Sequence, residues 1–111
     1  MSMGFITDEE VQKALDYLRD SAPKIANAKA QMVRCERMLK CTKALAMKAA
    51  NETSAAAQER EALCSEQYAG AVDDEFHAVE HHELLRALRD AAAIKIEAWR
   101  TASSNYRSMK I

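Results

Sequence analysis

The segment His77-Ala78-Val79-Glu80-His81 has the residue types and the spacing of a zinc-peptidase motif. In the inverted zinc peptidases, an HxxEH pattern places two histidines one helical turn apart as metal ligands, with a glutamate beside them as the general base. Such a site also needs a third ligand downstream and a cleft, and the 30 residues after His81 offer no obvious cleft-forming partner. Motifs of this length recur by chance. We therefore interpret the segment as a polar helix surface and expect no catalytic activity.

A simpler metal site is suggested by the spacing of three residues in the same region. Asp73, His77 and His81 follow one another at intervals of four, which places them on one face of a helix. Carboxylate and imidazole are ordinary ligands of divalent metals, so the stripe is a candidate for an adventitious or intersubunit ion. Because spacing is its sole support, we expect no resident metal and no cofactor.

Three cysteines, Cys35, Cys41 and Cys64, complete the residues with ligand or redox chemistry. Their number is odd, and no two have the short separation of a zinc-binding pair, so they predict neither a disulfide framework nor a zinc site. Free cysteines fit a reducing compartment. The sequence also lacks a run of about 18 apolar residues and the pattern of a secretory signal. We therefore expect a cytoplasmic protein without a membrane span.

The run from residue 95 to residue 107 combines aromatic, arginine and small hydroxyl residues. Trp99 and Tyr106 lie seven residues apart, and so on one face of a helix, and Arg100 and Arg107 directly follow them. Aromatic rings stack on unpaired bases and arginines bind phosphates. The pattern therefore suits contact with single-stranded DNA.

The alternative for the same run is internal packing. Trp99 and Tyr106 would then pack on the first helix through Tyr17, Leu18 or Phe5, leaving the arginines in solvent. We favour this alternative, because a lone tryptophan is usually part of a protein core.

Helices are expected throughout, because the chain has two glycines and one proline and is rich in alanine, glutamate, lysine, arginine and leucine. Thr7 and Glu10 have the spacing of a capping box, which predicts a short helix over about 8–20. Pro23 restricts the backbone of Ala22, so this helix is expected to end near residue 20.

A long helix is predicted over about 23–51, a turn or short helix over about 52–65, and a second long helix over about 66–106. The first long helix has a coiled-coil seam at Ile25, Ala28, Met32, Cys35, Leu39, Thr42, Ala46 and Ala49. The apolar face of the second is predicted at Tyr68, Val72, Phe76, Val79, Leu85, Leu88, Ala92, Ile96, Trp99 and Tyr106. The stretch His81-His82-Glu83 interrupts that face.

Charge is segregated along the chain. Residues 24–48 hold seven basic residues and one acidic residue, a balance of +6, whereas residues 59–83 hold eight acidic residues and one basic residue, a balance of −7. An antiparallel hairpin would lay these segments side by side, and charged flanks commonly set helix pairing. The basic segment is therefore expected to pair with the acidic segment of its own chain.

These patterns together predict a single all-α domain over residues 1–111. Its architecture would be an antiparallel helical hairpin, a coiled coil, with a short N-terminal helix. A chain of 111 residues buries only about two-thirds of its unfolded surface, and a hairpin buries less. We therefore expect a homo-oligomer in which hairpins associate into a bundle.

The second half of the chain resembles a family of small helical proteins of tailed bacteriophages and prophages, often encoded beside single-strand annealing and recombination genes. The resemblance covers about residues 40–107. Its motifs are Ala56-Ala57-Gln58-Glu59-Arg60-Glu61-Ala62 with Tyr68 after it, and Ile96-Glu97-Ala98-Trp99-Arg100 with Ser104-Asn105-Tyr106-Arg107. Leu63 stands where such proteins often have an aromatic residue. The family has no assigned activity, so the resemblance implies a phage or prophage origin and the bacterial host cytoplasm, but no catalytic residue.

The functional hypothesis is a non-enzymatic accessory of phage DNA recombination or replication that binds a protein partner or single-stranded DNA. Its expected contact residues are Trp99, Arg100, Tyr106 and Arg107, with Gln58, Glu59 and Arg60 at the hairpin turn as a second contact. The alternative is an interaction factor that inhibits or redirects a host protein and does not bind nucleic acid. Neither hypothesis involves a membrane or a small-molecule substrate.

Overall fold

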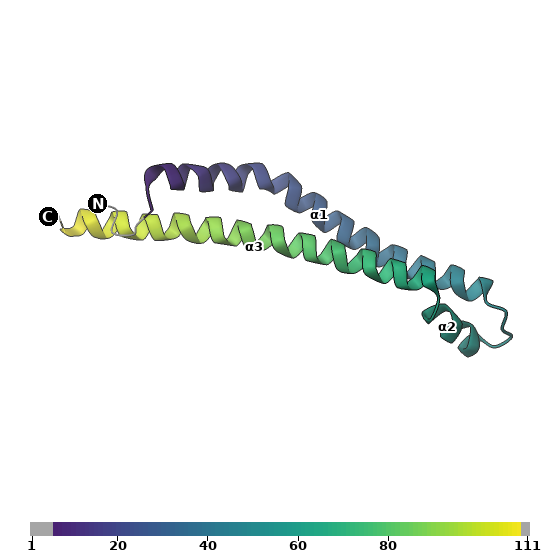
Figure 1. Ribbon diagram of the computed structural model, residues 1–111. Coiled ribbons are helices and arrows are strands. Elements are labelled where there is room, and N and C mark those ends of the chain that lie inside the picture. The colour runs from purple at the N-terminus through teal and green to yellow at the C-terminus, as the bar shows by residue number, and fades with distance from the viewer. Residues whose placement is uncertain (1–5, 110–111) are drawn as a thin grey trace. The chain divides into compact units, whose positions relative to one another are not determined.

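The structure, a computed structural model, describes residues 6–109 and is built from three helices (Figure 1). They are α1 (Asp8–Ala49), α2 (Ala55–Leu63) and α3 (Glu66–Met109), and no strand occurs in this range. The predicted all-α class is confirmed. No helix within residues 6–109 has a stretch long and apolar enough to cross a membrane.

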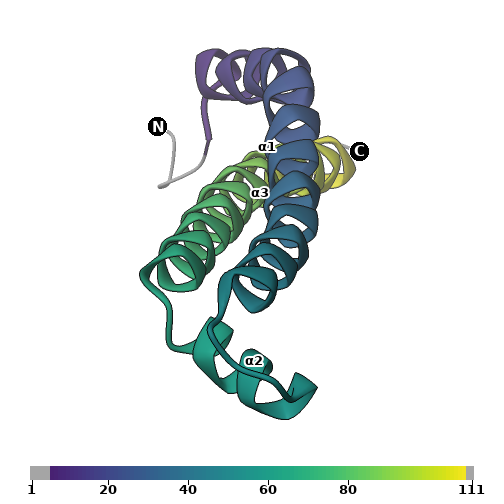
Figure 2. The same ribbon diagram turned by 90° about the vertical axis from the view of Figure 1, so that its right-hand side faces the viewer.

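Contacts between residues divide the chain into two compact units. The terminal unit combines the chain up to Ile25 with the chain from Leu84 onward, and the central unit is Ala26–Glu83. Within each unit, a segment of α1 runs antiparallel to a segment of α3 (Figures 1 and 2). In the central unit, α2 lies at the end where α1 stops and α3 begins.

The start of α1 is held by the predicted capping box. The Thr7 backbone N–H donates to Glu10 Oε2 at 3.1 Å, and the Glu10 backbone N–H donates to Thr7 Oγ1 at 3.1 Å. Each bond satisfies a backbone N–H that has no partner inside the helix. The capping box therefore fixes the first residue of α1 in the terminal unit.

The helix break predicted near residue 20 is wrong, because α1 continues from Asp8 to Ala49 with Pro23 inside it. Proline removes the N–H that would bond to the Arg19 carbonyl. Pro23 is exposed, so water can satisfy that carbonyl, as on the solvent side of curved helices. Its neighbours Ser21 and Ile25 are buried, Ser21 to 2% exposure. Burial on one face thus offsets the bond lost on the other.

The predicted seam of the segment after Pro23 is largely confirmed. Ile25 and Ala28 are buried, and five of the next positions are half-buried: Met32, Cys35, Leu39, Thr42 and Ala46. Ala49, the last predicted seam position, is exposed, because α1 ends there. Spacings of three and four residues therefore identified the packed face of α1.

Two serines set the bounds of α2 and α3. Ser54 is the N-cap of α2, and its side chain accepts the Ala57 backbone N–H at 3.1 Å. The Ser65 hydroxyl accepts the Tyr68 backbone N–H at 3.2 Å and donates to the Ala62 carbonyl at 2.7 Å. Ser65 therefore ends one helix and starts the next, and of the turn or short helix predicted over about 52–65 the structure has the helix.

The predicted apolar face of α3 is confirmed in part, because six of its ten residues are half-buried: Tyr68, Val72, Leu85, Ala92, Ile96 and Trp99. The buried and half-buried residues of α3 include Tyr68, Ala71, Glu75, Ala78, His82, Leu85, Arg89, Ala92, Ile96 and Trp99, at alternating spacings of three and four. Phe76 is 63% exposed, and Val79, Leu88 and Tyr106 are also exposed. The prediction followed the large apolar residues, whereas the packed row accepts alanine and polar residues in order to keep its spacing.

Candidate functional site

The C-terminal part of α3 carries the predicted aromatic and arginine residues. Trp99 is half-buried, and its indole Nε1–H donates to Asp8 Oδ1 at 3.1 Å in the first turn of α1. The side chain is thus engaged with α1 inside the terminal unit, as the packing alternative expected, although this bond is to Asp8 and not to Tyr17 or Leu18. Phe5, the third partner suggested, lies outside the described residues.

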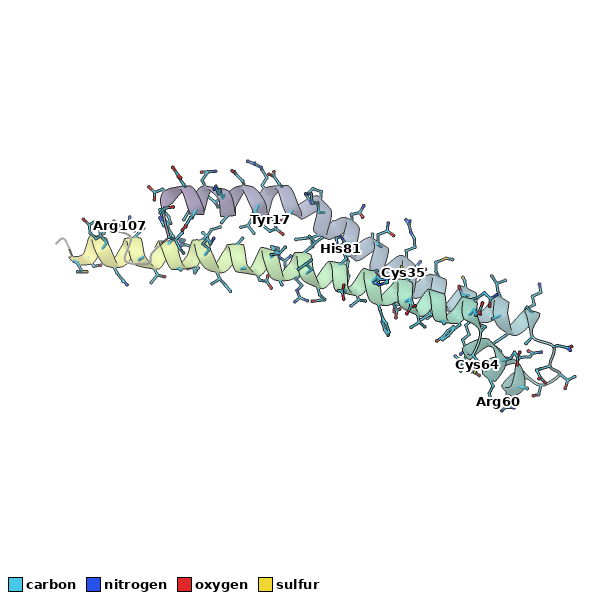
Figure 3. The ribbon with its side chains drawn as sticks, in the orientation of Figure 1. Tyr17, Cys35, Arg60, Cys64, His81 and Arg107 are labelled. Atoms are coloured by element: carbon cyan, nitrogen blue, oxygen red, sulfur yellow. The ribbon has the colours of Figure 1, made fainter. Side chains whose placement is uncertain are left out.

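The other three residues of this group are exposed. Tyr106 is 58% exposed, and Arg107 lies near the C-terminal end of α3 (Figure 3). The Arg100 guanidinium contacts Glu97 Oε2 at 3.2 Å, one turn earlier on the helix, whereas Arg107 makes no ion pair within residues 6–109. Trp99, Arg100 and Arg107 line one surface depression. We call Trp99, Arg100, Tyr106 and Arg107 the C-terminal surface.

The C-terminal surface has a definite chemical capacity. Tyr106 offers an exposed ring for stacking, and Arg107 offers a guanidinium with no acidic partner among residues 6–109. The positive charge of Arg100 is partly compensated by Glu97, and the Trp99 indole N–H is already bonded. The surface therefore suits one or two phosphate or carboxylate groups beside one planar group.

The second predicted contact, in α2 of the central unit, serves mainly the fold. Gln58 Nε2–H donates to the Glu52 carbonyl at 3.1 Å and so closes the loop before α2. Lys43 Nζ donates to Glu59 Oε1 at 2.9 Å and ties α2 to α1. Arg60 is exposed and has no ion pair in the described part of the chain (Figure 3). Of these three residues, Arg60 alone has an uncommitted side chain.

The Lys43–Glu59 pair shifts the pKa values of both partners. The hydrogen bond, and then the charge, of Lys43 lower the pKa of Glu59 from its ordinary value. The same hydrogen bond and the charge of Glu59 raise the pKa of Lys43. Both side chains reach solvent, so the pair orients α2 more than it stabilises the protein.

The candidate metal ligands are not gathered into a site. Asp73, His77 and His81 are all exposed along α3, and His81 is labelled in Figure 3. Within residues 6–109, no three acidic, histidine or cysteine side chains are grouped closely enough to hold a metal ion. The neighbouring His82 is the buried one, at 8% exposure. Its Nδ1 lies 3.5 Å from Glu83 Oε1 but forms no hydrogen bond.

The expected charge pairing between the long helices is not seen. In the central unit, Lys43 is joined to Glu59 of α2, and no ion pair links α1 with α3 in Ala26–Glu83. The basic residues Lys29, Arg34, Arg37, Lys40 and Lys48 therefore have no acidic partner in the described chain. Long charged side chains lose rotamer freedom when they pair at a surface, which makes such pairs marginal.

A groove in the central unit was not anticipated by the sequence analysis. It lies along α1 and the first turns of α3 and is lined by Cys35, Met38, Leu45, Cys64 and Gly70, among others; Cys35 and Cys64 are labelled in Figure 3. Met38 and Leu45 flank the seam of α1 at an interval of seven residues. An interval of seven residues places both side chains on one face of the helix, so it could have predicted a second apolar row beside the seam.

Comparisons of the chain with protein-family models, with curated proteins and with solved structures found no match.

Proposed function

We propose that this protein is a non-enzymatic accessory of a bacteriophage or prophage that supports DNA recombination or replication in the host cytoplasm. It binds single-stranded DNA or a protein partner through the C-terminal surface. The observation that carries the proposal is the pair of exposed residues at the end of α3, Tyr106 and Arg107, beside Arg100. Both belong to Ser104-Asn105-Tyr106-Arg107, a part of the second of the two motifs on which the resemblance to phage proteins depends.

We favour single-stranded over duplex DNA because of the kind of groups present. Tyr106 presents a ring that can stack on an unpaired base, whereas bases in a duplex are already stacked. Arg107 and Arg100 are close enough in sequence to contact phosphates on the same strand. A surface of this size implies modest affinity that depends strongly on salt.

The experiment is a fluorescence-anisotropy titration of labelled single-stranded and duplex oligonucleotides at about 50 mM and about 200 mM salt. We expect binding that prefers single strands and weakens with salt. Arg107→Glu should reduce the affinity by about tenfold and the salt slope by about one. Tyr106→Ala should reduce the affinity with little change in that slope.

The matched control is Arg37→Glu, which makes the same charge change at an exposed, unpaired arginine of the central unit. Arg37→Glu should change the affinity by less than about twofold, because Arg37 lies outside the C-terminal surface. An equal loss of affinity in both variants would indicate a nonspecific effect of charge. Absence of binding by the wild-type protein at low salt would exclude the DNA form of the proposal.

A second candidate is a purely protein-binding factor that inhibits or redirects a host protein. Exposed apolar side chains on α3 of the terminal unit, Leu88 and Ile94, favour it, because apolar groups contribute to protein interfaces and little to phosphate binding. Replacing Ile94 with aspartate would weaken such a complex and leave DNA affinity nearly unchanged.

We also propose that the long helices form a coiled-coil hairpin, as their seams suggest.

A further inference from the structure

The groove of the central unit has an apolar interior that the chain itself leaves uncovered. From α1 it is lined by Cys35, Met38 and Leu45, and from the other side by Cys64, Gly70 and Ala71. Met38 is 53% exposed and Leu45 is 67% exposed. Two large apolar side chains of one groove are thus mostly in water, which is unfavourable because apolar surface is more stable when it is buried.

No contact within the described chain requires a glycine at position 70 of this groove. A Cβ atom added to Gly70 would meet no atom of the chain within 4 Å. Glycine in a helix interior is less favourable than alanine. Gly70 therefore leaves space that another molecule can approach.

The two walls of the groove carry opposite charge. In the central unit, α1 holds six basic residues and one acidic residue (+5), whereas its part of α3 holds six acidic and no basic residues (−6). Arg34 lines the groove on the α1 side and Asp74 on the α3 side, both at the end away from α2. Neither makes an ion pair within residues 6–109. An occupant that pairs with both walls must carry acidic groups on the side that faces α1 and basic groups on the side that faces α3.

We propose that a second copy of this chain occupies the groove. The two copies face each other across a two-fold axis that runs along the helices, so that α1 of each copy packs on α3 of the other. Met38 and Leu45 are buried between the copies, and Arg34 of each copy pairs with Asp74 of the other.

The direction of the axis follows from the charges. Two identical faces can be related by a two-fold axis along the helices or across them. An axis across the helices places α1 on α1 and α3 on α3, so that like charges meet. An axis along the helices leaves the position of each residue along the groove unchanged and places the α1 wall of one copy against the α3 wall of the other. Arg34 of each copy then lies opposite Asp74 of the other, which gives two such pairs. The resulting assembly of antiparallel helices is a four-helix bundle.

The first test measures the dimer dissociation constant by analytical ultracentrifugation. Leu45→Asp should raise it by about a hundredfold, because a carboxylate would be buried in an apolar interface. Gly70→Leu should have a similar effect by filling the groove, and its Cβ atom would meet no other atom of the single chain within 4 Å. The matched control is Phe76→Asp, an equally exposed site in the same unit that does not line the groove. Dissociation by Phe76→Asp but not by Leu45→Asp would overturn the proposal.

The second test exchanges the charges between copies. Arg34→Asp and Asp74→Arg should each weaken the homodimer by about a hundredfold, because like charges then face each other. A mixture of the two variants should dimerise again, because each interface pair becomes Asp with Arg. Pairing inside one chain cannot give this result, since each variant alone carries two like charges. A wild-type monomer, or a mixture that stays monomeric, would refute the second-copy assignment whatever the DNA titration shows.

Discussion

His82 shows at the scale of one residue how a polar group is accommodated in a packed row. The side chain is buried and its Nδ1 has no hydrogen-bond partner. A buried polar atom without a partner costs about 1–3 kcal/mol, because the hydrogen bond to water is lost on folding and is not replaced. The position belongs to the row of α3 by its spacing from Glu75 and Ala78.

We expect His82→Leu to raise the free energy of unfolding by about 1 kcal/mol, because the substitution removes the unpartnered polar atom and adds apolar contact. Urea denaturation followed by circular dichroism measures the change. His81→Leu is the control, since His81 is exposed and adjacent in sequence, and it should change the value by less than about 0.5 kcal/mol. A less stable His82→Leu protein would mean that the imidazole has a partner that matters.

At the scale of the elements, the caps, the seam of α1 and part of the packed face of α3 could be predicted from sequence, whereas the continuation of α1 through Pro23 could not. Capping depends on a few adjacent residues, such as Thr7 with Glu10. Whether a proline ends a helix depends on the burial of its neighbours, which lies outside the local sequence. The prediction for α3 was wrong at Phe76, which is large and apolar but lies beside the packed row.

The Lys43–Glu59 pair joins α2 to α1, and its small contribution to stability depends on pH. Because the folded pKa of Glu59 is lowered, the pair stabilises the fold above the ordinary glutamate pKa and loses this effect as pH falls through the lower, folded value. Because the folded pKa of Lys43 is raised, the effect also persists up to high pH and is lost as pH rises through that higher value.

We therefore expect Glu59→Gln to be less stable than the wild type at neutral pH and equally stable well below the ordinary glutamate pKa, about 4.3. Thermal unfolding at a series of pH values measures the difference. Glu61→Gln, in the same helix and with no ion pair in the described chain, should show no such convergence. A difference of constant size across the acidic range would show that the pair is not formed in solution.

At the scale of the whole molecule, composition predicted the helical class, but charge balance did not predict the pairing. Residues 26–48 and 59–83 have opposite charge balances and lie in one unit, yet no ion pair joins α1 to α3 in that unit among the described residues. The sign of the charge on a helix surface can be predicted from sequence. Whether a given ion pair forms depends on side-chain entropy and solvation, which depend on local geometry. The candidate DNA residues were predicted by type, and only the structure showed that Trp99 is half-buried and bonded to Asp8.

The bond from Trp99 to Asp8 joins residues 91 positions apart, and this separation has a consequence for the order of folding. The central unit pairs segments that are close along the chain, so its closure costs little chain entropy, and it then brings the ends together for the terminal unit.

Mutations in the central unit, such as Leu39→Ala, should slow folding with a φ-value of about 0.5 or more, whereas Ile96→Ala should mainly speed unfolding, with φ below about 0.3. Stopped-flow chevrons provide both values, and the reverse order would show that the ends of the chain nucleate the fold.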